Sequence, residues 1–197
     1  TMAAVGRGTT IDHIQVVYAK DDAYEWFGGT VNCKYLIALK TQDDDFDSDN
    51  GYSGKVQFGI IIRDSLIADI SNSEAFESDN NSGGTTATPK TSAIFTNITA
   101  IGPRSTLTNL GSNLFRGATH IRRNTAISIF NSVFLGWPRG IEVDATTVTS
   151  TALNIEDSSL RLRNITIAGC GTNTRFSGTA GATITNDAAF TSWITNP

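Results

Sequence analysis

An internal repeat constrains the fold of this chain more than any other feature of its sequence. The segment 22–25, Asp-Ala-Tyr-Glu, recurs as Asp-Asp-Phe-Asp at 44–47, and again as Glu-Ala-Phe-Glu at 74–77. Each copy places an aromatic residue between acidic ones. Repeats of this length are typical of solenoids, in which each repeat forms one turn that stacks on the previous turn.

A second repeat lies in the C-terminal half of the chain. Segment 116–121 is similar to segment 139–144, in an alignment that matches Arg116 with Arg139. Segment 140–142, Gly-Ile-Glu, also looks like a later copy of the segment Ala-Tyr-Glu at 23–25. The repeat therefore extends over most of the chain.

Three apolar runs share an asparagine. Asn97, Asn131 and Asn164 each interrupt an alternating apolar run at almost equal spacings, and a glycine follows each of them five positions later. The alternation predicts strands. Asparagine tolerates the left-handed backbone of a sharp bend, and stacked amides could form a hydrogen-bonded ladder. Earlier runs at 11–18, 31–39 and 56–62 have similar apolar patterns without the asparagine.

These patterns predict an all-β fold, a right-handed parallel β-helix of about six turns. We expect the turns over residues 1–177, and a degenerate turn or C-terminal cap around Phe190 and Trp193 over residues 178–197. A β-sandwich or jelly roll is the alternative, but it would need hairpin turns, and Asn50-Gly51 is the one Asn-Gly or Asp-Gly dipeptide of the sequence. Helical spacing is not sustained anywhere. Because the strand pattern begins almost at the first residue, we expect a module of a larger exported protein.

Two stretches carry a resemblance to a known family. On IDHIQVVYAKDDAYEWFGGTVNCKYLIAL and DDDFDSDNGYSGKVQFGIIIRD, the chain resembles the pectate-lyase-like superfamily of parallel β-helix proteins, in particular surface or secreted proteins of the Bacteroidetes type. The resemblance covers essentially the whole chain. It implies an extracellular or bacterial cell-surface location, and it says less about chemistry.

Charge is distributed unevenly along the chain. Residues 21–79 hold 13 of the 19 acidic residues and only four lysines or arginines, whereas residues 80–197 hold nine basic and five acidic residues. This acidity disfavours nucleic acid as a partner. No apolar run is long enough to predict a transmembrane segment. Cys33 and Cys170 would be roughly 20 Å apart along such a solenoid, so both are expected to be free.

The repeat predicts where its carboxylates point. If the aromatic residue of each copy enters the core, strand alternation directs Glu25, Asp47 and Glu77 outward. Neighbouring turns stack about 4.8 Å apart, so these like charges would repel one another. We therefore expect a bound cation, a pairing with arginine or lysine, or a raised carboxyl pKa.

The aspartates of the segment 42–54 leave three interpretations open. They are a calcium site, a catalytic carboxylate cluster, and a solvated loop without metal. An EF-hand is excluded, because Gly51 lies one place late and Val56 stands where the bidentate glutamate belongs. The ligands of the looser calcium site would be Asp43, Asp44, Asp47 and Asp49.

Candidate catalytic residues follow from two kinds of chemistry. The resemblance to β-helical polysaccharide lyases implies a calcium ion that neutralises a uronate and an arginine that removes a proton, for which Arg116 and Arg139 are the candidates. Their alternative role is ion pairing along the surface to Glu142 and Asp144. The Gly-His-Gly and Arg-x-Lys units of β-helical polygalacturonases are absent.

A glycoside hydrolase needs two carboxyl groups at a set separation, for which Asp22 and Asp44 are the candidates. Glycan binding without catalysis needs exposed aromatic rings beside polar groups. Trp137 and Tyr52 are the ring candidates. The outward acidic residues Glu25 and Glu77 complete the predicted binding set.

Two hypotheses about function result. The first is a noncatalytic surface module, in which calcium could stabilise the fold, that binds a polysaccharide or a cell-surface protein. The second is a calcium-dependent polysaccharide lyase or a hydrolase of acidic polysaccharides. An arginine that faces an acidic cluster across a groove would favour the second hypothesis, and carboxylates scattered over separate faces would favour the first.

Overall fold

The strands of the chain alternate between two sheets. The computed structural model describes residues 1–104, 106 and 108–196. The elements are β1 (Met2–Ala3), β2 (Thr10–Val17), β3 (Tyr24–Phe27), β4 (Asn32–Leu39), β5 (Phe46–Asp49), β6 (Lys55–Ile62), β7 (Ser73–Ser78), β8 (Ile94–Ile101), β9 (Phe115–Ile121), β10 (Ser128–Leu135), β11 (Arg139–Ala145), α1 (Ala152–Glu156), β12 (Arg161–Ala168), β13 (Thr172–Gly178) and α2 (Asp187–Thr195).

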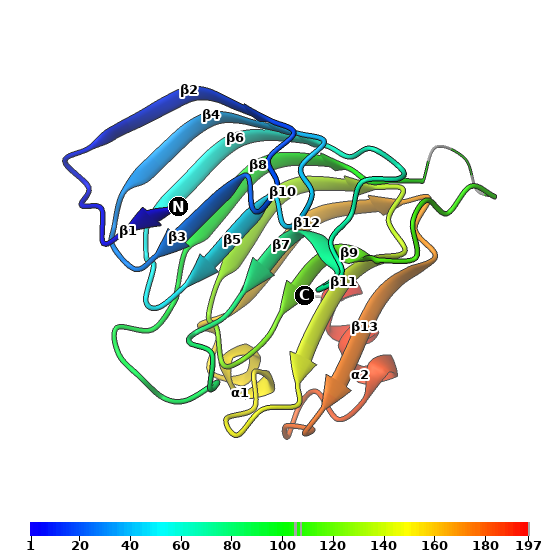
Figure 1. Cartoon of the computed structure of the whole chain (residues 1–197). Coiled ribbons are helices and arrows are strands. Elements are labelled where there is room, and N and C mark those ends of the chain that lie inside the picture. The colour runs from blue at the N-terminus through cyan, green and yellow to red at the C-terminus, as the bar shows by residue number, and fades with distance from the viewer. Residues whose placement is uncertain (105, 107, 197) are drawn as a thin grey trace.

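The odd-numbered strands form one sheet, sheet A, and the even-numbered strands form the other, sheet B (Figure 1). All of the described strand pairs are parallel, and each strand pairs with the strand two places along the chain. The fold is thus a right-handed parallel β-helix with six pairs of strands, as the sequence predicts. The sandwich alternative is wrong, because it requires antiparallel neighbours.

Aromatic side chains of successive turns fill the space between the sheets. Trp26, Phe46, Phe76 and Phe95 are fully buried, and their ring centroids lie 5.2 to 6.1 Å apart. The strand pairing places Phe46 in register with Phe76. The aromatic position of each acidic repeat therefore faces the core, which confirms the predicted parity.

A bend in every strand of sheet B shapes its outer surface. The predicted asparagines do adopt the left-handed conformation, and Asn164 Nδ2 donates to Asn131 Oδ1 at 3.1 Å. The earlier turns carry the same bend with aromatic residues in place of asparagine. The six residues of this bend row, with φ between 49° and 63°, are His13, Tyr35, Phe58, Asn97, Asn131 and Asn164.

Ring stacking compensates for this unusual backbone. The rings of His13 and Tyr35 lie 4.5 Å apart, and those of Tyr35 and Phe58 lie 5.1 Å apart. A side chain with a Cβ branch cannot take the left-handed conformation without strain. We expect Phe58→Val to be about 1 to 2 kcal/mol less stable than Phe58→Asn, although both lose the ring. Urea unfolding of the two variants measures this difference, and equal stabilities would contradict the backbone explanation.

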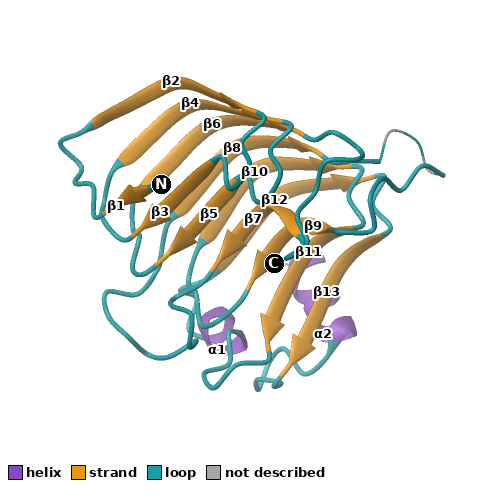
Figure 2. Ribbon diagram, in the orientation of Figure 1, coloured by secondary structure: helices purple, strands orange, loops and turns teal. Residues whose placement is uncertain are grey.

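Three details differ from the prediction. Ile141 pairs with Thr119 and Glu142 with His120, so the predicted alignment of segment 116–121 with segment 139–144 is wrong by one position. The sequence pattern also misses α1 and α2, which lie beside the last turns (Figure 2). Both are short, and α2 begins where Asn186 accepts a hydrogen bond from Ala189 N.

The C-terminal helix closes one end of the core. Phe190 on α2 is fully buried, and its ring lies 6.3 Å from that of Phe176. Cys33 and Cys170 are both free, as predicted. No helix in the described part of the chain is long and apolar enough to cross a membrane.

Candidate functional site

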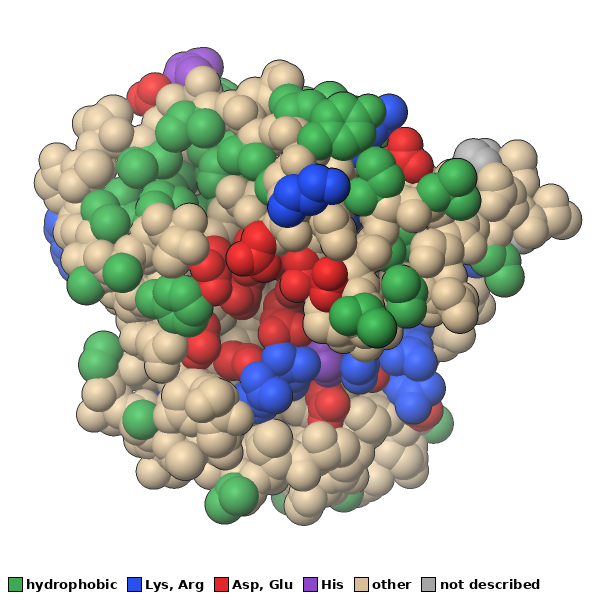
Figure 3. Space-filling model, in the orientation of Figure 1, with side chains coloured by type: hydrophobic (Ala, Val, Ile, Leu, Met, Phe, Trp, Pro, Cys, Tyr) green, Lys and Arg blue, Asp and Glu red, His purple; other side chains and the backbone are tan. Residues whose placement is uncertain are grey.

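One row of charged side chains runs along the outer face of sheet A. It lies one position after the buried aromatic row, and we call it the charged ladder. The strand register gives its members as Glu25, Asp47, Glu77, His120, Glu142 and Arg175. Figure 3 shows acidic side chains gathered in a hollow on this face, with basic side chains along its border. The carboxylates of the repeat therefore share one face, as the motif predicts.

A second acidic row precedes the charged ladder by three positions in each of the early turns. Asp44 N donates to Asp22 Oδ1 at 3.0 Å, and Glu74 N donates to Asp44 Oδ1 at 2.7 Å. Each carboxylate thus caps the backbone of the next turn. The first acid of the first two motif copies has this structural role, whereas the carboxylate of Glu74 lies against Arg116 and His120.

A small pocket opens between these two rows. Its volume is about 130 Å³, and its lining residues are Asp43, Asp44, Ser71, Asn72, Glu77 and Arg122. Ser71 Oγ donates to Asp43 Oδ2 at 3.2 Å, which holds the loop after β6 against the acidic turn. The pocket brings acidic residues of two turns opposite an arginine of a third.

Arg63 fixes the turn that carries Asp43, Asp44 and Asp45. Its fully buried side chain donates to Asp45 Oδ2 at 2.8 Å and to the carbonyl oxygens of Thr41, Asp43 and Glu74. Asp45 therefore points inward. This corrects the solvated-loop interpretation for Asp45, which is fully buried.

Three carboxyl groups, one on β5 and two just before β3 and β5, have raised pKa values. Burial, together with the charges of Glu77 and Asp22, raises the pKa of Asp47 well above its ordinary value. Burial also raises the pKa of Asp22 to about 7 and that of Asp43 to about 6. No hydrogen bond or ion pair is formed by the Asp47 side chain within the described residues. Burial therefore favours the protonated form of all three groups.

Glu77 has the opposite environment. Burial acts to raise the pKa of Glu77, but the hydrogen bond from His120 and the charges of Arg122 and Arg123 outweigh it and hold that pKa below its ordinary value. Arg122 contacts Glu77 and donates to Asp79 Oδ1 at 2.8 Å. The surroundings therefore favour the ionised form of Glu77 and the protonated form of its neighbour Asp47.

His120 lies at the centre of the ladder with a positive charge. Its Nδ1 is 3.3 Å from Glu74 and 3.7 Å from Glu77, and its Nε2 is 3.4 Å from Asp144. Burial acts to lower the pKa of His120, but these three carboxylates raise it to about 10. The imidazolium thus separates the acidic turns from the basic turns.

The basic end of the ladder is neutralised internally. Arg116 Nη2 lies 2.9 Å from Glu142 Oε1, and Arg139 Nη1 lies 2.7 Å from Glu142 Oε2. Arg116 also lies 3.8 Å from Asp144. The predicted ion pairs of Arg116 and Arg139 are confirmed, and neither guanidinium is an unpaired base.

The predicted aromatic platform is wrong. Trp137 and Tyr52 are both fully buried. Tyr52 stacks on Trp26 at 5.2 Å and donates to Val31 O, while Trp137 Nε1 donates to Ala100 O at 3.2 Å. Their loops turn inward and extend the core, so neither ring can contact a sugar.

The candidate metal ligands regroup in the structure. The predicted set of Asp43, Asp44, Asp47 and Asp49 is not among the groups of described residues whose ligand atoms all approach within 4.8 Å. Such groups are formed by Asp22 with Glu25 and Asp47, by Asp21 with Asp22 and Asp43, and by Glu74 with Glu77 and His120.

The first of these groups fits a hard cation. It offers three carboxyl groups, whose oxygens Ca²⁺ prefers once Asp22 and Asp47 release their protons, and no lysine or arginine forms an ion pair with Asp22 or Asp47 among the described residues. The group with His120 does not fit, because a protonated imidazole cannot ligate a metal. Calcium at this face would therefore lie at Asp22, Glu25 and Asp47.

Sequence reasoning missed His120 and Arg122 as site residues. Both lie on or directly after β9, where the repeat is disguised because its acidic position holds a histidine. An alignment that matches His120 with Glu142, as the strand register does, would have placed His120 on the charged ladder. The sequence signal that could have identified His120 is therefore a spacing of 22 residues between the two copies of the repeat.

The raised pKa of Asp22 makes stability depend on pH. The folded chain binds the Asp22 proton up to about pH 7, whereas an ordinary aspartate releases it near pH 3.8. Stabilisation from this proton is therefore complete below pH 4 and lost as the pH rises to 7, by roughly 2 to 4 kcal/mol. We expect the melting temperature to fall over this range and to fall less in Asp22→Asn.

The exposed residue Asp157 provides the control for this titration. Hydrogen bonds from Ser159 lower the pKa of Asp157, so Asp157→Asn should leave the slope between pH 4 and 7 unchanged. Thermal unfolding followed by circular dichroism measures all three profiles. A slope in Asp22→Asn as steep as that of the wild type would contradict the assignment.

Comparison with known proteins identifies the family but not the chemistry. The family model described as "pectate-lyase like beta helix domain" matches residues 1–196. No curated protein and no solved structure shows a significant match to the chain. The family match and the two parallel sheets agree with one another, and the chain belongs to the pectate-lyase like beta helix domain family.

Proposed function

We propose that the outer face of sheet A hydrolyses a polysaccharide, with Asp47 as the proton donor and Glu77 as its ionised partner. The observation that carries this proposal is geometric: two carboxyl groups at register partners have opposite surroundings, since Arg122 pairs with Glu77 and no ion pair of Asp47 is formed among the described residues. Asp47 and Glu77 are paired across β5 and β7, and the pKa of Asp47 is raised while that of Glu77 is lowered. Such a division separates the acid from the base in many hydrolases.

The spacing of the two residues suggests a mechanism. Neighbouring strands lie about 4.8 Å apart, close to the separation of about 5 to 5.5 Å that retaining glycosidases use. Asp47 would protonate the glycosidic oxygen, and Glu77 would attack the anomeric carbon. Water would then hydrolyse the glycosyl intermediate, with Asp47 acting as the base, and the product would keep its anomeric configuration.

The environment of the pair supports catalysis more than binding alone. Arg122 faces the acidic residues across the pocket, which is the arrangement that favours the enzymatic hypothesis. Arg122 and His120 both stabilise the charge of Glu77. A module that only binds glycan has no need for two carboxyl groups with opposite protonation.

The charges also favour a substrate class. The early turns carry the unpaired acidic residues, so the sugar at Asp47 should be uncharged. An acidic sugar fits better beside Arg139 and Arg175 at the later turns, where arginines surround Glu142. We also propose that this activity lies outside the cell or on its surface, as the sequence resemblance to secreted β-helix proteins implies.

A calcium-dependent lyase is the second candidate. The grouping of Asp22, Glu25 and Asp47, which could bind a cation, favours it, since bound calcium would neutralise a uronate there. A lyase also needs a base, however, and Arg116, Arg122 and Arg139 are all held in ion pairs. We therefore place hydrolysis first.

One assay separates the alternatives. The chain is incubated with neutral and uronate-containing polysaccharides, with calcium or with a chelator, and reducing ends and unsaturated products are measured. Reducing ends without unsaturated products, in chelator, support hydrolysis, and proton NMR of the early product should show a retained anomer. Unsaturated products that require calcium would establish the lyase instead. Binding without any cleavage would leave a noncatalytic glycan-binding module.

A further inference from the structure

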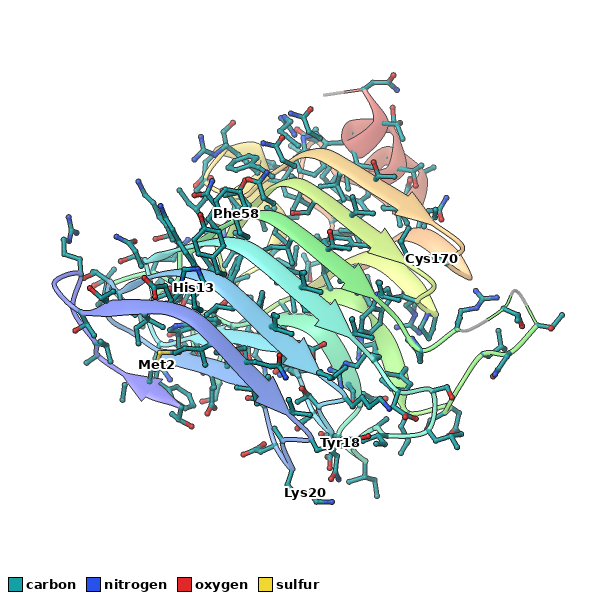
Figure 4. The ribbon with its side chains drawn as sticks, turned by 90° about the horizontal axis from the view of Figure 1, so that it is seen from above. Met2, His13, Tyr18, Lys20, Phe58 and Cys170 are labelled. Carbon is teal, nitrogen blue, oxygen red and sulfur yellow. The ribbon has the colours of Figure 1, made fainter. Side chains whose placement is uncertain are left out.

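The outer face of sheet B exposes apolar side chains beyond the bend row. One outward row is entirely aliphatic: Val17, Leu39, Ile62, Ile101, Leu135 and Ala168. The other outward row combines Ile37, Ile60 and Val133 with the polar residues Gln15, Thr99 and Thr166. Ile60 is 44% exposed, Val17 41% and Ile101 40%, values that are high for residues of this size. Contiguous exposed apolar surface of this kind marks an interaction site. Figure 4 looks onto the strands of this face, with His13 and Phe58 on the bend row.

The aromatic rings of this face are poorly placed to bind sugar. His13, Tyr35 and Phe58 stack on one another, so the ring faces between neighbours are already in contact and mainly their edges meet solvent. A sugar needs an open ring face. This observation argues against glycan as the occupant.

The groove along the bend lacks the groups that would select a small charged ligand. Its volume is about 560 Å³, and apart from His13 its lining has no ionisable side chain except the phenol of Tyr35. The strands within the sheet use their backbone hydrogen bonds for their neighbours. The occupant must therefore be matched through shape and apolar contact, which is typical of a protein surface.

We propose that this face binds the same face of a second copy of the chain, related by a twofold axis that runs along the strands between β6 and β8. The axis places β2 of one copy opposite β12 of the other, β4 opposite β10, and β6 opposite β8. Each row of side chains across the sheet therefore faces the same row of the second copy in reverse order. Asp12 on β2 comes opposite Arg163 on β12, and Lys34 comes opposite Phe130. The Arg163 guanidinium lies over the Trp193 ring at 5.4 Å and can still pair with Asp12 at the border of the face. Lys34 would meet a ring over which Arg161 already lies at 5.6 Å.

The bend row is complementary to itself under the same axis. Its first half carries large rings and its second half carries asparagines, so projecting side chains face smaller ones. The facing pairs are His13 with Asn164, Tyr35 with Asn131, and Phe58 with Asn97. No other order of the strands pairs every ring with an amide.

The two outward rows match as well. The reversed order brings Ile37 opposite Val133, Leu39 opposite Leu135, and Ile62 opposite Ile101. Polar Gln15 comes opposite polar Thr166 at the ends of one row. Beside the axis, Ile60 comes opposite Thr99, so the contact is apolar throughout the row of Ile62 and Ile101 and includes one threonine at the centre of the other row.

The size of the face is sufficient for a specific dimer. Six strands of eight residues cover about 26 Å by 29 Å, or ~750 Å². Stable interfaces bury about 800 Å² on each partner. Because this surface lies on sheet B, the dimer leaves the charged ladder of sheet A open to substrate.

Sedimentation velocity of the intact chain between about 1 and 100 μM tests the proposal. We expect the wild type to shift from monomer to dimer in this range. Ile62→Lys, which places charges beside the axis, should remain monomeric. Asp12→Arg should weaken the dimer about tenfold, and the double variant Asp12→Arg/Arg163→Asp should recover most of the loss.

Two controls keep the result interpretable. Val148→Lys changes a side chain that is 92% exposed outside sheet B, and it should dimerise as the wild type does. Circular dichroism confirms that each variant is folded. A wild type that stays monomeric at the highest concentration overturns the proposal, whatever else the face binds. A dimer that tolerates both Ile62→Lys and Asp12→Arg lies elsewhere and overturns it equally.

Discussion

Glu77→Gln is expected to slow hydrolysis of the polysaccharide identified for the wild type by about a thousandfold. The amide has nearly the same shape as the carboxylate but carries no charge, so it can neither attack the anomeric carbon nor act as a base. Glu77 is the residue that His120, Arg122 and Arg123 keep ionised. Initial rates over a range of substrate concentrations should show that the loss lies in kcat more than in KM.

Asp47→Asn should give a comparable loss for a different reason. It removes the proton donor, so aryl glycosides with good leaving groups should retain more activity than the polysaccharide. Asp157→Asn is the matched control, because Asp157 is exposed and lies outside sheet A. Activity of Glu77→Gln above half of the wild-type value would contradict the assignment of Glu77.

Arg63→Met is expected to lower the free energy of unfolding by about 3 to 5 kcal/mol. Methionine keeps most of the volume but leaves the buried carboxylate of Asp45 without its ion pair. It also removes the hydrogen bonds to the carbonyl oxygens of Thr41, Asp43 and Glu74. Urea unfolding measures the loss.

The same substitution should affect the site. Arg63 fixes the backbone of the turn that presents Asp43 and Asp44, so any activity should fall even where the variant is folded. Arg7→Met, at an exposed position, is the control and should change stability by less than about 0.5 kcal/mol. A loss below about 1 kcal/mol in Arg63→Met would show that the turn is held by other contacts.

The acidic half of the site was predictable because the motif fixes its own register. An aromatic residue that must be buried determines the direction of the acid beside it, so Glu25, Asp47 and Glu77 could be placed outward from the sequence. The inward direction of Asp45 was not predictable, because it depends on Arg63, which follows the next strand of sheet B and has no periodic relation to it.

Other features needed the three-dimensional structure for physical reasons. The bend could be read from Asn97, Asn131 and Asn164, whose side chains suit a left-handed backbone, but not from Tyr35 or Phe58, whose propensity favours ordinary strands. Stacking between turns makes those residues tolerable, and stacking is a property of the assembled solenoid.

The burial of the aromatic residues in loops could not be predicted from the sequence either. Trp137 and Tyr52 follow strands in polar surroundings, so their sequence suggests solvent exposure. In the fold each ring turns into the core, where a backbone carbonyl accepts its polar hydrogen. Local polarity could not reveal a partner that comes from another turn.

The central claim is that two neighbouring carboxyl groups on sheet A differ in protonation. Carboxyl ¹³C NMR, with Asp47→Asn and Glu77→Gln to assign the two signals, measures their pKa values directly. We expect Asp47 to titrate well above the ordinary aspartate value of 3.8 and Glu77 to titrate below the ordinary glutamate value of 4.5. Ordinary values for both groups, or a Glu77 that takes up its proton before Asp47 as the pH falls, would contradict the account.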